Sequence, residues 1–225
     1  MERYAVLTGD IVGSSNISGH NRNKLLNELK NIFHDIQYYI LDNQNNNFEI
    51  FRGDSFQGIV YEPEKALLVG IILRAGLRHK SEKNTINNLW DSRISIGFGT
   101  VEYFADQVAE SDGPAFWYSG KGLDQMKNQE QRLRITTDQS FINEEFHVEC
   151  ALSDTIIRRW TTQQAEAVYL YFLEKLTQQE IGHRLGTSQR AIGKRLASAS
   201  IPAIKTFLNR YESIIKNNFR WKLQA

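Results

Sequence analysis

The stretch from Phe48 to Tyr61 constrains the fold more than any other part of the chain. Two runs rich in aromatic and β-branched residues, 48–51 and 56–61, flank the turn Arg52-Gly53-Asp54-Ser55. Because Gly tolerates a positive φ and Asp can cap its own backbone, this stretch predicts a β-hairpin. An isolated hairpin is only marginally stable in water, so other segments of the chain must cover it.

The segments around the hairpin supply a strand and a helix on each side. A short apolar strand at 4–7 precedes a helix from about 21 to 41, and a second helix opens at Pro63 before a strand at 93–103. The first helix carries apolar residues at a spacing of three to four, namely Leu25, Leu29, Ile32, Phe33, Ile36 and Ile40. This order predicts a ferredoxin-like α+β domain, with an antiparallel sheet and helices on one face. Two late strands are predicted at 132–137 and 146–151.

Two aspartates are predicted to meet at one edge of this sheet. Asp10 ends the first strand and Asp54 lies in the hairpin turn, and the alternating strand directions place both at the same edge. Two carboxylates suit Mg²⁺, which takes few protein ligands and keeps positions for water and phosphate oxygens. The adjacent small loop, with Gly13, Ser14 and Ser15, offers backbone N–H groups to an anion.

A simpler interpretation of these residues stays open. A Gly-Asp pair in a hairpin is often turn chemistry alone, since Asp bonds to its own backbone. Arg52 and Arg93 can contact phosphates, but solvation or pairing with the two aspartates is the simpler role.

The motifs Gly9-Asp10-Ile11, Arg52-Gly53-Asp54 and the strand 93–99 resemble class III nucleotidyl cyclases and their diguanylate cyclase relatives. The resemblance implies that Asp10, Asp54 and the carbonyl of Ile11 hold Mg²⁺ or Mn²⁺. It also implies a nucleotide near Gly13, Ser14, Ser15, Arg52 and Lys121. The opening YAVLTGDIVGSS, together with a helix-turn-helix downstream, resembles the SatD family of proposed bacterial regulators. This resemblance covers nearly the whole chain.

The sequence departs from the cyclase pattern on a later helix. In the stretch 120–128, Asp124 stands where cyclases carry Asn, and Asn128 stands where they carry Arg. Lys121 and Lys127 can supply a cation, but neither has the fixed fork of Arg. Charge stabilisation in the transition state provides most of the rate in phosphoryl chemistry, so the pattern favours nucleotide binding over turnover. Lys121, Asp124 and Lys127 remain weak catalytic candidates.

The two parts of the chain differ in charge. Residues 1–150 contain 15 Lys and Arg against 21 Asp and Glu, a net charge of −6, and residues 151–225 contain 12 against 5, a net charge of +7. A basic segment indicates a polyanionic partner, because neutralising phosphates supplies most non-specific affinity for nucleic acid. We therefore expect a cyclase-like domain over 1–152 and a DNA-binding domain over 153–225.

A helix-turn-helix pattern occurs within this basic part. Thr177 with Glu180 forms a capping box, Gly186 makes a turn and Ser188 caps the following helix. The stretch 160–210 resembles region four of bacterial sigma factors, although a generic helical hairpin remains an alternative. The residues expected to contact duplex DNA are Thr187, Ser188, Gln189, Arg190, Lys194 and Arg195.

The sequence therefore predicts a cytoplasmic transcriptional regulator whose cyclase-like part binds a nucleotide or a divalent metal as a signal. Two alternatives stay open: an active cyclase or nucleotidyltransferase coupled to DNA binding, and a degenerate cyclase-like domain used only for dimerisation. We expect a homodimer and no membrane span. The lone cysteine, Cys150, excludes an internal disulfide and fits a core position in a reducing compartment.

Overall fold

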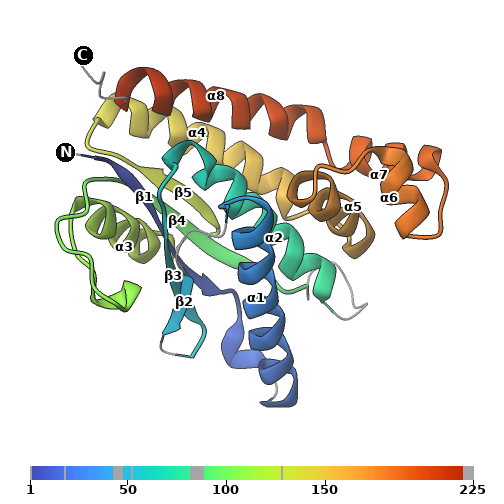
Figure 1. The fold of residues 1–225 in the computed structure, drawn as a ribbon, viewed down its shortest axis with the longest axis horizontal. Helices are drawn as coiled ribbons and strands as arrows, with labels where there is room; N and C mark the ends of the chain where they lie inside the picture. The colour runs from blue at the N-terminus through green and yellow to red at the C-terminus, as the bar shows by residue number, and fades with distance from the viewer. Residues whose placement is uncertain are drawn as a thin grey trace.

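The computed structural model of the chain describes residues 2–17, 19–42, 48–51, 53–81, 89–127 and 129–219. These residues form a mixed α+β structure in which helices pack around one five-stranded sheet (Figure 1). The order of the strands across the sheet is β2-β3-β1-β4-β5. The strands are β1 (Tyr4–Ile11), β2 (Phe48–Phe51), β3 (Ser55–Val60), β4 (Ser92–Gly99) and β5 (Leu133–Thr136).

The pairs β2–β3, β3–β1 and β1–β4 are all antiparallel, as the sequence predicted, but β5 runs parallel to β4. The expectation of a wholly antiparallel sheet is therefore wrong at this edge. The reason is the connection between the two strands, because the chain crosses back over the sheet through α3 (Pro114–Met126). A crossover of this kind is what two parallel neighbouring strands require.

Helices cover both faces of the sheet, so the prediction of helices on one face is also wrong. Helices α1 (Gly19–Tyr39) and α2 (Ala66–Lys80) share a core with Ile94, Ile96 and Phe98 of β4. The alternate residues of β4 face α3, and Gly97 has no side chain to hold that helix away. In the sequence, small residues at alternate positions of a strand look like the side of a strand that faces solvent. Here they instead allow a helix to pack closely.

Residues 146–151, which the sequence predicted as a strand, lie inside α4 (Ser140–Ile157). The buried residues of α4 recur at helical spacing, and they include Ile142, Phe146, Cys150 and Ile157. A window of six residues is too short to separate this period from that of a strand. The expected domain boundary at 152 and 153 falls within α4, and the two-domain division stays a prediction.

The remaining helices follow α4 along the chain. They are α5 (Thr162–Leu173), α6 (Gln178–Arg184), α7 (Gln189–Ser198) and α8 (Ile201–Phe219), and short 3-10 turns occur at η1 (Ser14–Asn16), η2 (Pro63–Lys65) and η4 (Val108–Glu110). Helices α6 and α7 project at the right of the view, and α8 runs back beside α4 (Figure 1). One hydrophobic core continues from the sheet into these helices, because Ile181, Ile192 and Tyr211 belong to the same buried cluster as Ile94.

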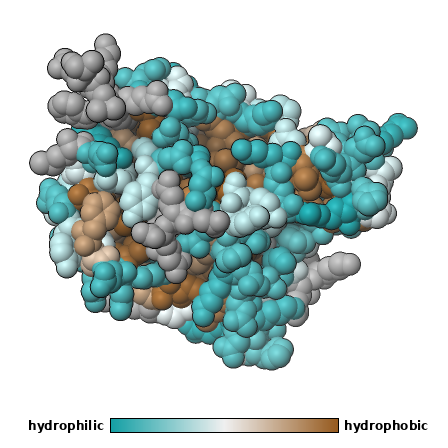
Figure 2. All heavy atoms as spheres, viewed as in Figure 1, coloured by the Kyte–Doolittle hydropathy of each residue, from teal (hydrophilic) through white to brown (hydrophobic). Residues whose placement is uncertain are grey.

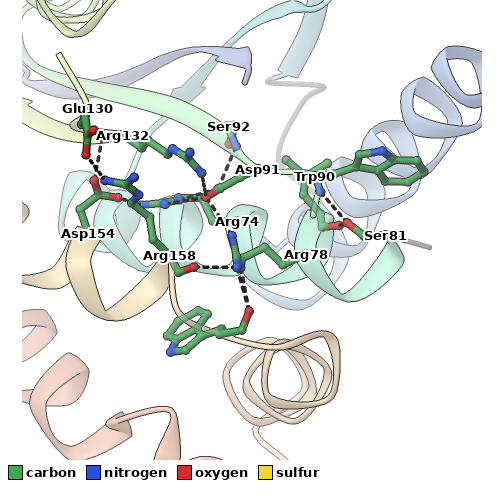
Figure 3. Close-up of polar contacts among 12 residues, drawn as sticks. Arg74, Arg78, Ser81, Trp90, Asp91, Ser92, Glu130, Arg132, Asp154 and Arg158 are labelled. Atoms are coloured by element: carbon green, nitrogen blue, oxygen red, sulfur yellow. Dashed lines mark hydrogen bonds and ion pairs between the residues drawn. The ribbon is translucent and has the colours of Figure 1, made fainter. Parts of the chain in front are cut away.

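A cluster of buried charged residues lies inside this structure, centred on Asp91 (Figure 3). Asp91, fully buried just before β4, accepts hydrogen bonds from Arg74 Nε and Nη2, both at 2.8 Å, and from Arg132 Nη1 at 2.9 Å. Arg78 Nη1 adds a contact at 3.3 Å. Burial alone would raise the pKa of Asp91, but the charges of Arg74, Arg78 and Arg132 outweigh it and hold the pKa well below its usual range.

The same arginines reach the C-terminal helices. Arg74 Nη1 donates to Asp154 of α4 at 2.6 Å, and Arg78 Nη2 donates to the carbonyls of Arg158 and Trp160, both at 2.8 Å. The indole of Trp160 in turn donates to the carbonyl of Ala199 at 2.9 Å. The cluster thus ties α2 and the start of β4 to α4, to the link before α5 and to the end of α7.

The close packing of α3 predicts a contrast between two glycines. A Cβ on Gly97 would stand 2.1 Å from the carbonyl oxygen of Ala115, whereas a Cβ on Gly120 would meet nothing within 4 Å. We expect Gly97→Ala to lower the free energy of unfolding by more than about 2 kcal/mol, because the backbone of α3 must move. Gly120→Ala should raise it by about 0.5–1 kcal/mol through helix propensity. Urea denaturation measures both, and equal effects would contradict this packing.

The ion cluster predicts a large effect of neutralising Asp91. Asp91→Asn leaves Arg74 and Arg78 buried without their main counter-charge, so unfolding should become easier by about 3–5 kcal/mol. Glu130→Gln is a matched control, since Glu130 pairs with Arg158 at the surface and its side chain is 89% exposed. That change should cost less than about 1 kcal/mol. A loss below about 1 kcal/mol for Asp91→Asn in urea denaturation at pH 7 would refute the role given to the cluster.

Candidate ligand and nucleic-acid sites

The end of β1 and the turn between β2 and β3 lie together at one edge of the sheet. Asp10 is opposite Ser55 in the strand register, and the backbone N–H of Ile11 donates to the carbonyl of Asp54 at 3.3 Å. The structure therefore brings Asp10 and Asp54 to the same edge, as the topological argument predicted. Their role as metal ligands stays a prediction.

Arg93 occupies both oxygens of the Asp10 carboxylate. Its Nε donates to Oδ1 at 2.8 Å and its Nη2 donates to Oδ2 at 2.9 Å, and Asp10 is only 8% exposed. This is the pairing that the simpler interpretation of the sequence allowed. A cation bound by Asp10 must therefore displace Arg93 or share the carboxylate with it.

Asp10 faces the side of the sheet on which α3 packs. Thr8, two residues before it on the same face, exchanges a hydrogen bond with Ser119 of α3 at 2.8 Å and accepts one from Gln57 at 2.9 Å. Gly9, on the opposite face, leaves room for a ring, since a Cβ there would stand 2.3 Å from Phe56. The Gly-Asp sequence thus combines a packing requirement with a polar group.

A second cation, which the sequence analysis did not identify, lies beside the hairpin turn. Gly53 adopts a φ of +80°, and a Cβ at this position would stand 2.6 Å from Nη2 of Arg22 on α1. Helix α1 starts soon after the loop that follows β1, so its first turn reaches the same edge, which is the signal that could have identified Arg22. Asp54 is half-buried. Arg52, predicted to bind a nucleotide, lies outside the described residues.

The loop after β1 contains the other predicted nucleotide contacts. Gly13 has a left-handed φ of +68° and precedes η1, in which Ser14 is half-buried and Ser15 is exposed. The backbone N–H of Val12 donates to the carbonyl of Asp91 at 2.9 Å, so this loop is anchored to the residue at the centre of the ion cluster. Ile11 itself is buried in the core, which leaves only its backbone for a ligand.

The candidates on α3 point to solvent. Lys121, Asp124 and Lys127 are all exposed, whereas Ser119 and Gly122 face the sheet. Asp124 forms an ion pair with Lys127 at 2.7 Å, so these two weak catalytic candidates satisfy one another at the surface.

Helices α6 and α7 are joined by a tight turn. Both predicted caps are confirmed: Thr177 and Glu180 form a capping box on α6, and Ser188 accepts from the N–H of Ala191 on α7. Gly186 has a φ of +61°, and a Cβ on Gly182 would stand 2.9 Å from the carbonyl oxygen of Thr187. Gly186 thus permits the left-handed turn, and Gly182 lets the start of α7 pack directly on α6.

The outer face of α7 carries most of the residues predicted to contact DNA. Ser188, Gln189, Arg190 and Lys194 are exposed, and Ile192 and Leu196 are buried beneath them. The surface over this projecting end is mainly hydrophilic on the face shown in Figure 2. Thr187 and Arg195 are half-buried, and Arg195 pairs with Glu166 of α5 at 3.7 Å. Arg195 is therefore partly committed to holding α7 against α5.

Comparison with known proteins identifies the family. The SatD family model matches residues 4–214, which is nearly the whole chain. The chain belongs to the SatD family. This match includes both the sheet edge and the α6–α7 pair.

Other comparisons add little to the family assignment. The SatD-family chain matches no curated protein. Its structure is similar to the active GGEEF domain of a diguanylate cyclase from Vibrio cholerae, at 15% identity and a TM-score of 0.42, over 61% of this chain and 84% of that chain. Across the described residues of the SatD-family chain, no helix combines the length and apolar character needed to cross a membrane.

Proposed function

We propose that this SatD-family protein is a transcriptional regulator that binds duplex DNA through α7. The observation that carries the proposal is the outer face of α7, where Gln189, Arg190 and Lys194 are exposed over buried Ile192 and Leu196. Within the part of the chain that the structure describes, neither Arg190 nor Lys194 takes part in an ion pair. Their charges are thus available to phosphates and base edges.

The distribution of charge supports the same orientation. The net charge of +7 on residues 151–225 attracts a polyanion, and the net charge of −6 on residues 1–150 repels it. Helices α6 and α7 project from the rest of the molecule (Figure 1), which leaves them accessible to a duplex. Gln and Arg at the start of α7 are residue types that pair with adenine and guanine edges.

The DNA proposal predicts different effects for two cations on α7. Arg190→Ala should weaken binding to a preferred duplex by about 1–3 kcal/mol and relax its sequence preference, if Arg190 reads a base. Lys194→Ala should weaken all duplexes alike and reduce the salt slope by about one, if Lys194 neutralises a phosphate. Fluorescence anisotropy with a selected duplex and a scrambled duplex, from 50 to 200 mM salt, measures both effects.

Lys216→Ala is the control for a general loss of charge. Lys216 lies near the end of α8 and pairs with Glu212, away from α7. It should leave affinity and salt slope unchanged. If Arg190→Ala and Lys194→Ala also leave them unchanged, α7 is not the DNA-binding element.

We further propose that the sheet edge binds a nucleotide with Mg²⁺ or Mn²⁺ as a signal. The support is the meeting of Asp10, Asp54 and the Gly13 loop at one edge, with the two cationic side chains of Arg22 and Arg93 beside them. In the structure Arg93 neutralises Asp10. Asp10 and Asp54 would hold the metal, and Arg93, released from Asp10, would bind a phosphate oxygen of the nucleotide.

This proposal predicts a nucleotide-dependent gain in thermal stability. At a ligand concentration of 100 times Kd the gain is about 2.7 kcal/mol, and each kcal/mol raises the Tm of a chain of this size by about 2–4 °C. Differential scanning calorimetry with ATP, GTP, CTP and UTP, each with Mg²⁺ or Mn²⁺, should show the increase for one of them. Asp10→Asn and Asp54→Asn should abolish it, and Asp106→Asn, at an exposed site on the loop after β4, should retain it.

The same samples separate the remaining alternatives. No increase in Tm with any nucleotide would refute the signal site and favour a sheet domain that serves only dimerisation. A cyclic or linear product found by chromatography of the incubated samples would instead identify an enzyme.

A further inference from the structure

Helix α4 has an exposed apolar stripe in addition to its buried face. Phe141 is 63% exposed, Val148 is 58% exposed and Leu152 is 65% exposed, and Ala151 lies on the same exposed side. The spacing of seven and four residues places Phe141, Val148 and Leu152 along one line on the helix, with Ala151 beside it. We call Phe141, Val148, Ala151 and Leu152 the α4 stripe.

The opposite side of α4 packs into the main hydrophobic core. Ile142, Phe146, Cys150 and Ile157 are fully or almost fully buried in the main core. The α4 stripe therefore contributes nothing to the interior of the described structure. Exposed apolar side chains gathered on one side of a helix are typical of a surface that another protein covers.

The charges at the two ends of the stripe have opposite signs. Glu144 is exposed near its N-terminal end, and Arg159 is exposed just beyond its C-terminal end. Within the described residues, neither side chain forms an ion pair. A second α4 in antiparallel orientation would place Glu144 of each copy near Arg159 of the other, whereas a parallel orientation would place like charges together.

We propose that the α4 stripe is a homodimer interface, in which the α4 helices of two copies pack antiparallel about a two-fold axis near residue 150. In this arrangement Val148 of one copy lies against Leu152 of the other, and Phe141 lies near Arg159. Two-fold symmetry makes each contact occur twice, which is the usual arrangement of soluble homodimers. The stripe extends over about 17 Å of helix and supplies an apolar centre with a charged rim.

This interface goes beyond the proposed function and does not depend on it. It requires neither DNA nor a nucleotide, and none of its residues lies at the sheet edge or on α7. Its consequence for DNA binding is that one assembly carries two α7 helices related by a two-fold axis, which suits a palindromic site. The competing occupant within the same chain is the segment 220–225, which contains Trp221 and Leu223.

Analytical ultracentrifugation of the full chain at 50 μM tests the dimer. A mass of twice 26.0 kDa is expected for the unaltered chain. Val148→Glu combined with Leu152→Glu should raise the dissociation constant by at least about 100-fold, because it places four carboxylates in an apolar centre. Tyr103→Glu, at a side chain that is 60% exposed on the loop after β4, should leave the dimer intact. Circular dichroism and a thermal melt verify that each variant is folded.

Disulfide trapping tests the antiparallel orientation. The lone native cysteine, Cys150, is fully buried, so an introduced thiol reacts alone. Ala151→Cys lies next to the axis and should form an intermolecular disulfide on mild oxidation. Glu144→Cys should not, because the two copies of residue 144 are about 18 Å apart along the paired helices.

Four results would overturn the proposal. The first is a monomer at 50 μM, and the second is a dimer that the double substitution leaves intact. The third is efficient trapping through Glu144→Cys with none through Ala151→Cys. The fourth is a monomer that becomes a dimer only when residues 220–225 are deleted. The last result would mean that the chain covers its own stripe.

Discussion

The buried carboxylate of Asp91 is the constraint on which the rest of the structure depends. Removing an ion from water costs several kcal/mol, so a fully buried aspartate requires close cationic partners. Those partners, Arg74 and Arg78, are themselves buried and therefore need further acceptors. Asp154 and the backbone carbonyls of residues 158 and 160 provide them. The cluster is satisfied only when the sheet, α2 and the C-terminal helices are all in place. Its contribution is to select one arrangement of these elements, more than to add net stability.

The cluster also lies between the two candidate sites. The backbone of Asp91 holds the loop that contains Gly13 at the sheet edge, and its side chain leads through Arg78 and Trp160 to Ala199 at the end of α7. The β2–β3 turn lies at the bottom of the view in Figure 1 and the α6–α7 pair lies at the right. The two sites are thus on different sides of the molecule but are both linked by hydrogen bonds to the ion cluster.

The sequence predicted the elements with strong periodicity better than their arrangement. Strands β1 to β4, helices α1 and α2 and the caps at Thr177 and Ser188 follow from local patterns, and so does the meeting of Asp10 with the hairpin turn. The side on which α3 packs does not, because Gly97 and Ser95 resemble a solvated face until a helix is placed on them. The ion cluster is missed for a different reason. Asp91 and Asp154 lie far from Arg74 in the sequence, and only an arginine inside an apolar helix indicates that a buried partner exists.

Helix α4 has a further consequence, because it passes without interruption through residue 152. A protease or an expression boundary at this point would cut the last turn from the helix and also divide the ion cluster. One fragment would retain Arg74, Arg78 and Asp91 without Asp154, and the other would retain Asp154 with Trp160 and Tyr211 no longer covered. Each fragment would therefore hold unpaired interior charge or exposed aromatic surface. We therefore expect neither the sheet nor the basic helices to be stable when the other part is removed.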